Sequence, residues 1–157
     1  APAGQMPYPQ MTLGNLLLSA KRARCSAQTI TERSQYSRLM VQFDAMRSKW
    51  LSAWRGKAAN EFRARLNLWR DFLEAYRDRP EANQDRYNYE VNRRVLLELL
   101  ANETSEIPAE QREMLAGLDA LLRSLLVPGG FIWQVDIQDC FPKETYWYLY
   151  GSLPAES

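Results

Sequence analysis

The chain has 157 residues, of which 46% are hydrophobic and 25% are charged, and its formal net charge is +1. These values fit one globular domain with a single core, and no apolar run reaches the ~18 residues that a transmembrane segment needs. The absence of histidine removes the commonest general base and the commonest metal ligand.

The charges are divided between the two halves of the chain. Residues 1–79 contain fourteen Lys and Arg and six Asp and Glu, a net charge of +8, whereas residues 80–157 contain six and thirteen, a net charge of −7. Such halves attract each other within one fold or between copies. A basic half also suits nucleic acid, anionic lipid or an acidic protein.

The N-terminal region predicts an extended arm followed by a short helix. Residues 1–11 are rich in Pro and Gly and show no periodicity, whereas Thr12 can cap a helix over Leu13–Cys25. No acidic residue precedes Glu32, although three basic residues do. That composition is typical of organelle-targeting segments, so we expect a reducing intracellular compartment or an organelle such as the mitochondrion.

The longest periodic segment runs from Ile30 to Arg79, and the capping-box spacing of Thr29 and Glu32 places its start. Its large apolar residues recur at steps of three and four, the spacing of one helical face: Tyr36, Leu39/Met40, Phe43, Met46, Trp50/Leu51, Trp54, Ala58, Phe62, Leu66, Trp69, Phe72/Leu73 and Tyr76. The segment is either one long helix or a hairpin bent at its single glycine, Gly56. The apolar phase continues across Gly56, which favours the continuous helix.

Two further helices are predicted after this segment. Pro80 suits the first turn of a helix over Pro80–Ala101, residues 102–107 form a linker, and Pro108 begins a helix that runs to Leu126. In the tail, alternating residues predict an extended Phe131–Ile137, and Pro142–Tyr150 reads as a short helix closed by Gly151.

The fold prediction is mainly α, with four to five helices in an irregular or extended bundle around one long amphipathic helix. One domain spans residues 1–157 and comprises an extended N-terminal arm (1–11), a helical body (12–126) and a Trp/Tyr-rich C-terminal tail (127–157).

Candidate catalytic chemistry is sparse. Asp136 and Asp139 could bind a cation, but capping or loop solvation is the simpler interpretation, with Asp139 as the cap of the last predicted helix. Cys25 and Cys140 could form a disulfide, but two distant cysteines favour free thiols. The sequence contains no His/Cys metal-ligand cluster and no glycine-rich phosphate loop. We therefore predict no catalytic residue, no metal site and no cofactor.

The basic residues of the long segment raise the alternative of a nucleic-acid-binding module, because they could follow a phosphate backbone. They are Arg38, Arg47, Lys49, Arg55, Lys57, Arg63, Arg65, Arg70, Arg77 and Arg79. Five acidic residues lie among them, and the aromatic residues belong to the apolar face. A solvated or partner-facing helix surface is therefore the favoured interpretation.

One short segment resembles a known family. Trp54-Arg55-Gly56-Lys57-Ala58, followed by Phe62, is similar to the signature of the small Trp-x-Gly helical-hairpin proteins exported by type VII secretion. The resemblance implies a turn at Trp54–Gly56, pairing with a second copy, and secretion. The chain departs from that family in its length, in the break at Pro80 and in its aromatic tail, so the function is not transferred.

The sequence favours a non-catalytic structural or interaction protein, an accessory or scaffold subunit of a larger complex, over an enzyme. Its expected partners are other protein subunits, with peripheral contact to a membrane complex as a further possibility. The candidate partner-binding residues are the large aromatic ones: Trp50, Trp54, Trp69, Trp133, Tyr146, Trp147, Tyr148 and Tyr150.

Overall fold

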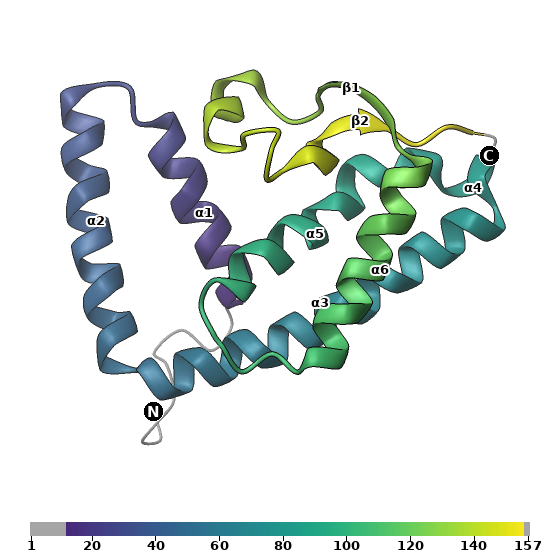
Figure 1. Ribbon diagram of the computed structural model, residues 1–157. Helices are drawn as coiled ribbons and strands as arrows, with labels where there is room; N and C mark the ends of the chain where they lie inside the picture. The colour runs from purple at the N-terminus through teal and green to yellow at the C-terminus, as the bar shows by residue number, and fades with distance from the viewer. Residues whose placement is uncertain (1–11, 156–157) are drawn as a thin grey trace.

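The computed structural model describes residues 12–155 and confirms the mainly α fold, with 76% of residues helical (Figure 1). The expected N-terminal arm, residues 1–11, lies outside the described residues. The α-helices are α1 (Leu13–Ser26), α2 (Ile30–Lys49), α3 (Leu51–Asp78), α4 (Pro80–Asn83), α5 (Tyr87–Ala101) and α6 (Ala109–Leu125). The tail contains strands β1 (Val127–Phe131) and β2 (Tyr150–Ser152), and the 3₁₀ turns are η1 (Gln84–Arg86), η2 (Val135–Cys140) and η3 (Trp147–Leu149).

The first two helices begin where the capping residues predict. The Thr12 hydroxyl accepts a hydrogen bond from the backbone N–H of Asn15 at 3.2 Å, and the Thr29 hydroxyl accepts one from Glu32 at 3.1 Å. Each bond satisfies a backbone donor that has no partner within its helix. Both helix starts are therefore encoded locally.

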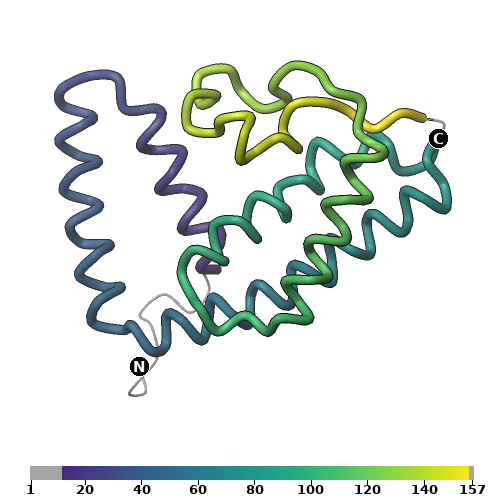
Figure 2. Tube along the Cα trace, in the orientation of Figure 1, coloured from purple at the N-terminus to yellow at the C-terminus, as the bar shows by residue number. Residues whose placement is uncertain are grey.

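The segment Ile30–Arg79 is divided at Trp50. Both expectations, a single long helix and a hairpin bent at Gly56, were therefore wrong about its shape. Trp50 has φ −111° and ψ 28°, outside the helical region, although its N–H still donates to the Met46 carbonyl. The chain turns sharply here, and α2 stands away from α3 (Figures 1 and 2). Long-range contacts determine the corner, because a Glu103 oxygen accepts hydrogen bonds from both Arg47 and Trp54 at 2.9 Å.

Gly56 lies inside α3, as the continuous apolar phase indicates. The turn that the Trp-x-Gly resemblance implies at Trp54–Gly56 is therefore wrong, since these residues are helical and the chain bends at Trp50 instead. A side chain at Gly56 would have no neighbouring atom within 4 Å. Nothing in the packing requires glycine there.

The core lies along the predicted apolar face of α3. Every large residue predicted for that face from Trp54 onward is buried: Trp54, Phe62, Leu66, Trp69, Phe72, Leu73 and Tyr76, together with Ala58. α5 lies against this face, with α1, α2, α4 and α6 also in contact with α3. No described helix is both long and apolar enough to cross a membrane.

The helix predicted over Pro80–Ala101 is interrupted by η1, so that α4 and α5 are separate. Its first half is polar and buries little, and Tyr87 is its first fully buried side chain. The helix predicted over Pro108–Leu126 is confirmed as α6, with Pro108 as its N-cap residue. The described residues thus form six α-helices, because the long segment and this segment are each divided.

The predictions for the tail were wrong in detail. The extended strand is β1, which ends at Phe131, and it pairs antiparallel with β2 so that Val127 lies opposite Ser152. Most of the segment expected to be extended leads into η2, and the helix expected over Pro142–Tyr150 is only the short turn η3. Local pattern could not show this pairing, because the partner strand is supplied by a distant part of the tail. Asp139 consequently lies in η2 and caps no helix there.

We expect Gly56→Ala to raise the free energy of unfolding by about 0.5–1 kcal/mol, because alanine is the better helix former and the added methyl group meets open space. Urea denaturation monitored by circular dichroism measures the change. Gly117→Ala is the matched control, since Gly117 also lies within a helix in open surroundings. A loss of stability in Gly56→Ala alone would contradict the continuous helix.

Candidate partner-binding surface

Most of the predicted partner-binding aromatic residues form the core of the chain itself. Trp54, Trp69, Tyr146, Tyr148 and Tyr150 are buried, and the other three predicted residues are half-buried: Trp50, Trp133 and Trp147. The fold itself therefore covers most of these aromatic side chains. A partner surface has to be sought elsewhere on the described residues.

The tail is attached to the helices through tyrosine hydroxyls. Tyr76 of α3 donates a hydrogen bond to the Pro154 carbonyl, and Tyr87 of α5 donates one to the Tyr148 carbonyl. Burial raises the pKa of Tyr76 and of Tyr87. Both tyrosines are therefore neutral at physiological pH and act as hydrogen-bond donors.

A buried guanidinium connects α5, α6 and the tail. Arg94 donates two hydrogen bonds to the Asp119 carboxylate, at 2.8 and 2.9 Å, and its guanidinium carbon lies 4.6 Å from the centre of the Tyr148 ring. Burial by itself would lower the pKa of Arg94, but the hydrogen bonds that Arg94 donates to Asp119, together with the charge interactions with Tyr148, Asp119 and Glu98, outweigh it and raise the pKa. These contacts hold α5, α6 and the tail together.

The residues considered for catalysis are not brought together in a reactive arrangement. Asp136 and Asp139 are exposed in η2. Within residues 12–155 there is no group of three or more Cys, Asp or Glu side chains that could bind a metal ion. Asp136 and Asp139 therefore belong to no such group among the described residues.

The expectation of two free thiols was wrong. Cys25 and Cys140 are joined by a disulfide, with their Cα atoms 5.9 Å apart, inside the range that disulfides span. The two residues are 115 positions apart, so no local pattern could pair them. They meet because the end of α1 packs against η2.

Five of the ten basic residues considered for nucleic-acid binding form ion pairs within the fold. The ion pairs join Arg47 to Asp44 and Glu103, Lys57 and Arg65 to Glu61, Arg70 to Asp71, and Arg79 to Asp78. A continuous cationic track along α3 does not result, because acidic residues interrupt it.

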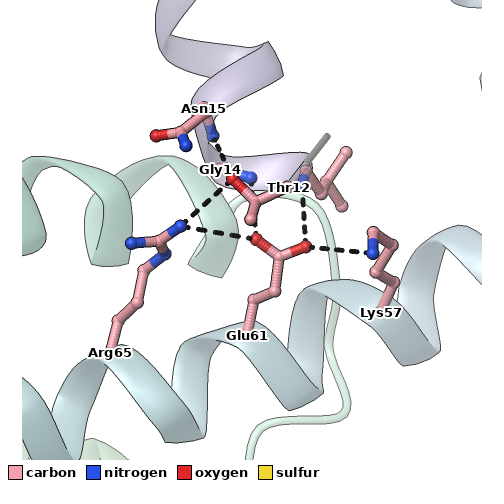
Figure 3. Close-up of polar contacts among 7 residues, drawn as sticks. Thr12, Gly14, Asn15, Lys57, Glu61 and Arg65 are labelled. Atoms are coloured by element: carbon pink, nitrogen blue, oxygen red, sulfur yellow. Dashed lines mark hydrogen bonds and ion pairs between the residues drawn. The ribbon is translucent and has the colours of Figure 1, made fainter. Parts of the chain in front are cut away.

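Glu61 is the most connected acid on α3 (Figure 3). Its carboxylate accepts hydrogen bonds from the backbone N–H groups of Leu13 at 2.7 Å and Gly14 at 3.0 Å, which are the first two residues of α1. Negative charge at a helix N-terminus is favoured by the free N–H groups and by the helix dipole. Lys57 and Arg65 flank the carboxylate, and Arg65 also donates to the Thr12 hydroxyl at 3.1 Å. This cluster attaches the start of α1 to α3.

α2 is a long helix with little tertiary cover. It has twenty residues, of which only Phe43 is buried, and its main contacts are with α1 and α3. Its inner side carries half-buried residues such as Tyr36 and Met40. The side turned away from α1 is exposed along its whole length.

The outer face of α2 combines apolar and cationic side chains. We define it as Ile30, Arg33, Ser34, Ser37, Arg38 and Val41, which helical spacing places on one side. Ile30 is 83% exposed and Val41 is 69% exposed. The first five of these residues line a shallow depression. Ion pairs to Arg33 or Arg38 are absent from the part of the chain that the structure describes.

Comparison with known proteins gives no family for the chain. No protein-family model, no curated protein and no solved structure matches it. The outer face of α2 is therefore assessed from its own chemistry.

The aromatic prediction did not include this face. Ile30 and Val41 do not follow the three- and four-residue spacing of the apolar residues that continues into α3. This departure was the sequence signal that could have identified the outer face of α2. Arg38 did appear among the basic residues of the long segment. An apolar residue that departs from the core phase of an amphipathic helix is informative, because it has to be exposed if the phase is right.

We expect Glu61→Gln to lower the free energy of unfolding by about 1–3 kcal/mol, because the amide leaves one α1 donor poorly satisfied and removes the charge that attracts the helix dipole. Urea denaturation measures the change. Glu113→Gln is the matched control, since Glu113 is an exposed acid of α6. Equal stability of both variants would contradict the anchoring role of Glu61.

Proposed function

We propose that this chain is a non-catalytic interaction protein, an accessory or scaffold subunit that binds an acidic surface of a partner protein through the outer face of α2. The observation that carries the proposal is that α2 is a twenty-residue helix with one buried side chain. The proposal gives a reason for a helix that the other residues of 12–155 leave largely uncovered.

The energetic argument concerns the source of helix stability. Most helical stability in proteins comes from packing an apolar face, and short helices without packing are marginal in water. Burial of a side chain such as Ile30 or Val41 contributes roughly 1.5–3 kcal/mol. A partner on the outer face of α2 would thus supply the burial that α1 and α3 leave incomplete.

The charge argument concerns the kind of partner. Residues 12–49, which contain α1 and α2, carry seven basic and two acidic side chains, a net charge of +5. Arg33 and Arg38 lie between the exposed Ile30 and Val41 along the outer face. Arginine pairs well with carboxylates through its planar fork of donors, so an acidic protein surface with an apolar strip complements this face.

Nucleic acid and anionic membrane surfaces would also attract a positive face. Nucleic acid is less favoured, because Ile30 and Val41 offer apolar contact that a phosphate backbone does not use, and half of the cations of α3 form ion pairs within the fold. Peripheral contact with a membrane complex is compatible with the proposal, since an acidic subunit of such a complex would be a suitable partner.

We expect the double substitution Arg33→Glu/Arg38→Glu to lower the yield of the native complex at least tenfold while leaving the fold unchanged, because both arginines are exposed on the outer face. The measurement is affinity isolation of the tagged full chain from its native cells, followed by native mass spectrometry of the complex and of its subunits.

Arg77→Glu serves as the matched control, because Arg77 is also exposed but lies near the end of α3. Recovery of the wild-type chain only as a monomer would refute the proposal. Loss of the complex on nuclease treatment, with steep salt dependence, would support nucleic-acid binding instead.

A further inference from the structure

We propose that Cys25 and Cys140 form a reversible thiol–disulfide exchange site that clasps the arm made of α1 and α2 (residues 12–49) to the C-terminal segment, and thereby determines how firmly α2 is positioned. The regulatory meaning of this site rests on the proposed function of α2. The exchange itself and its effect on the arm do not.

The arm is attached to α3 at two places. The start of α1 is attached through Glu61, with Leu13 fully buried beside it. The end of α2 is attached through Phe43, whose ring meets Trp54 edge to face at a centroid distance of 5.2 Å. Both attachments lie at the same end of the arm, and the α1–α2 connection lies at the other (Figure 1).

The disulfide lies near the end of the arm at which α1 connects to α2. Cys25 is in the last turn of α1, and Cys140 is the last residue of η2. Close to it, the Lys21 ammonium lies 5.2 Å from the centre of the Phe141 ring, and the Arg22 guanidinium carbon lies 4.8 Å from that of Trp133. These cation–π contacts are weak when exposed, at about 0.5–1 kcal/mol each. The disulfide is therefore the strongest tie between the far end of the arm and the tail.

Cys25 and Cys140 are both half-buried, and neither belongs to the fully buried core. A reductant can therefore reach the bond without first unfolding the core. Positive charge favours thiolates, and Cys25 follows Lys21, Arg22 and Arg24 in the same helix. We assign Cys25 as the thiolate that is displaced on reduction and that attacks on reoxidation, since Cys140 instead follows Asp136 and Asp139 and no basic residue lies in η2.

The reaction is ordinary thiol–disulfide exchange with a dithiol or with two glutathione molecules. A reductant thiolate attacks Cys140, and Cys25 leaves as a thiolate. The second reductant thiol then displaces Cys140 from the mixed disulfide. The reductant becomes a disulfide and supplies two electrons and two protons, and the chain gains two thiols.

Reduction removes the covalent tie at the far end, and leaves in place both attachments to α3 and the packing of α1 against α5 and η2. The arm then becomes more mobile, and any partner of α2 has to order it on binding. The oxidised arm is already ordered, so its association costs less conformational entropy. The oxidised chain is accordingly the form that binds better.

The test uses the purified full chain in buffers of graded reduced-to-oxidised glutathione ratio. Maleimide labelling and intact-mass analysis measure the thiols, and hydrogen exchange measured by mass spectrometry reports on local opening. We expect the two thiols to appear and disappear together, reversibly, in the folded chain. Amide exchange should rise at least tenfold over residues 20–45 on reduction, with residues 58–76 and 91–100 remaining protected.

The variant Cys25→Ser/Cys140→Ser should exchange like the reduced chain under all buffers. If that variant does not fold, the reduced wild-type chain provides the same comparison. Three outcomes would each overturn the proposal: thiols that appear only with global unfolding, reduction without any change in exchange over residues 20–45, and cysteines that never pair. None of these readouts involves a partner, so failure here is distinguishable from failure of the proposed function.

Discussion

The apolar face of α3 is the constraint on which the rest of the structure depends, because α3 contacts each of the other described α-helices. Its fully buried residues recur at helical spacing from Trp54 to Tyr76. α5 covers this face most extensively, and the apolar residues that it turns inward are almost fully buried: Tyr87, Val91, Val95, Leu96, Leu97 and Leu100. The acidic second half of the sequence thus does cover the basic first half, but through apolar packing between α3 and α5, with ion pairs at the margins.

The same helix determines the path of the arm. Both attachments of the arm lie on α3, at Trp54 and at Glu61, seven residues or about 10 Å apart along the helix axis. A chain that leaves and returns at neighbouring points has to double back on itself, so α1 and α2 form a hairpin (Figure 2). The disulfide closes the hairpin against the tail at its far end. The proposed partner binding rests on the exposed, positively charged helix α2. The proposed thiol–disulfide exchange rests on the disulfide that joins the arm to the tail.

The candidate site was only partly predictable from the sequence. The large aromatic residues were reasonable candidates, because such residues are enriched at interfaces, but the same property makes them good core residues. Which role each takes depends on the surfaces that the fold brings to it. Tyr148 lies against Arg94 and accepts a hydrogen bond from Tyr87, and none of these neighbours is close to it in the sequence. The departure of Ile30 and Val41 from the apolar spacing indicated that they are exposed, but only the structure showed that no other described element covers them.

By itself the sequence determined the features that local chemistry controls. These are the capped starts of α1 and α2, the continuity of α3 through Gly56, the stop before Pro80, and the extent of α6. Hydrogen bonds and apolar spacing within a few residues are sufficient for each. Only the tertiary structure decided the corner at Trp50, the strand pairing of the tail and the pairing of Cys25 with Cys140. The physical reason is that each depends on partners far away in the chain: Glu103 holds the corner from 53 residues away, and 115 residues separate the two cysteines.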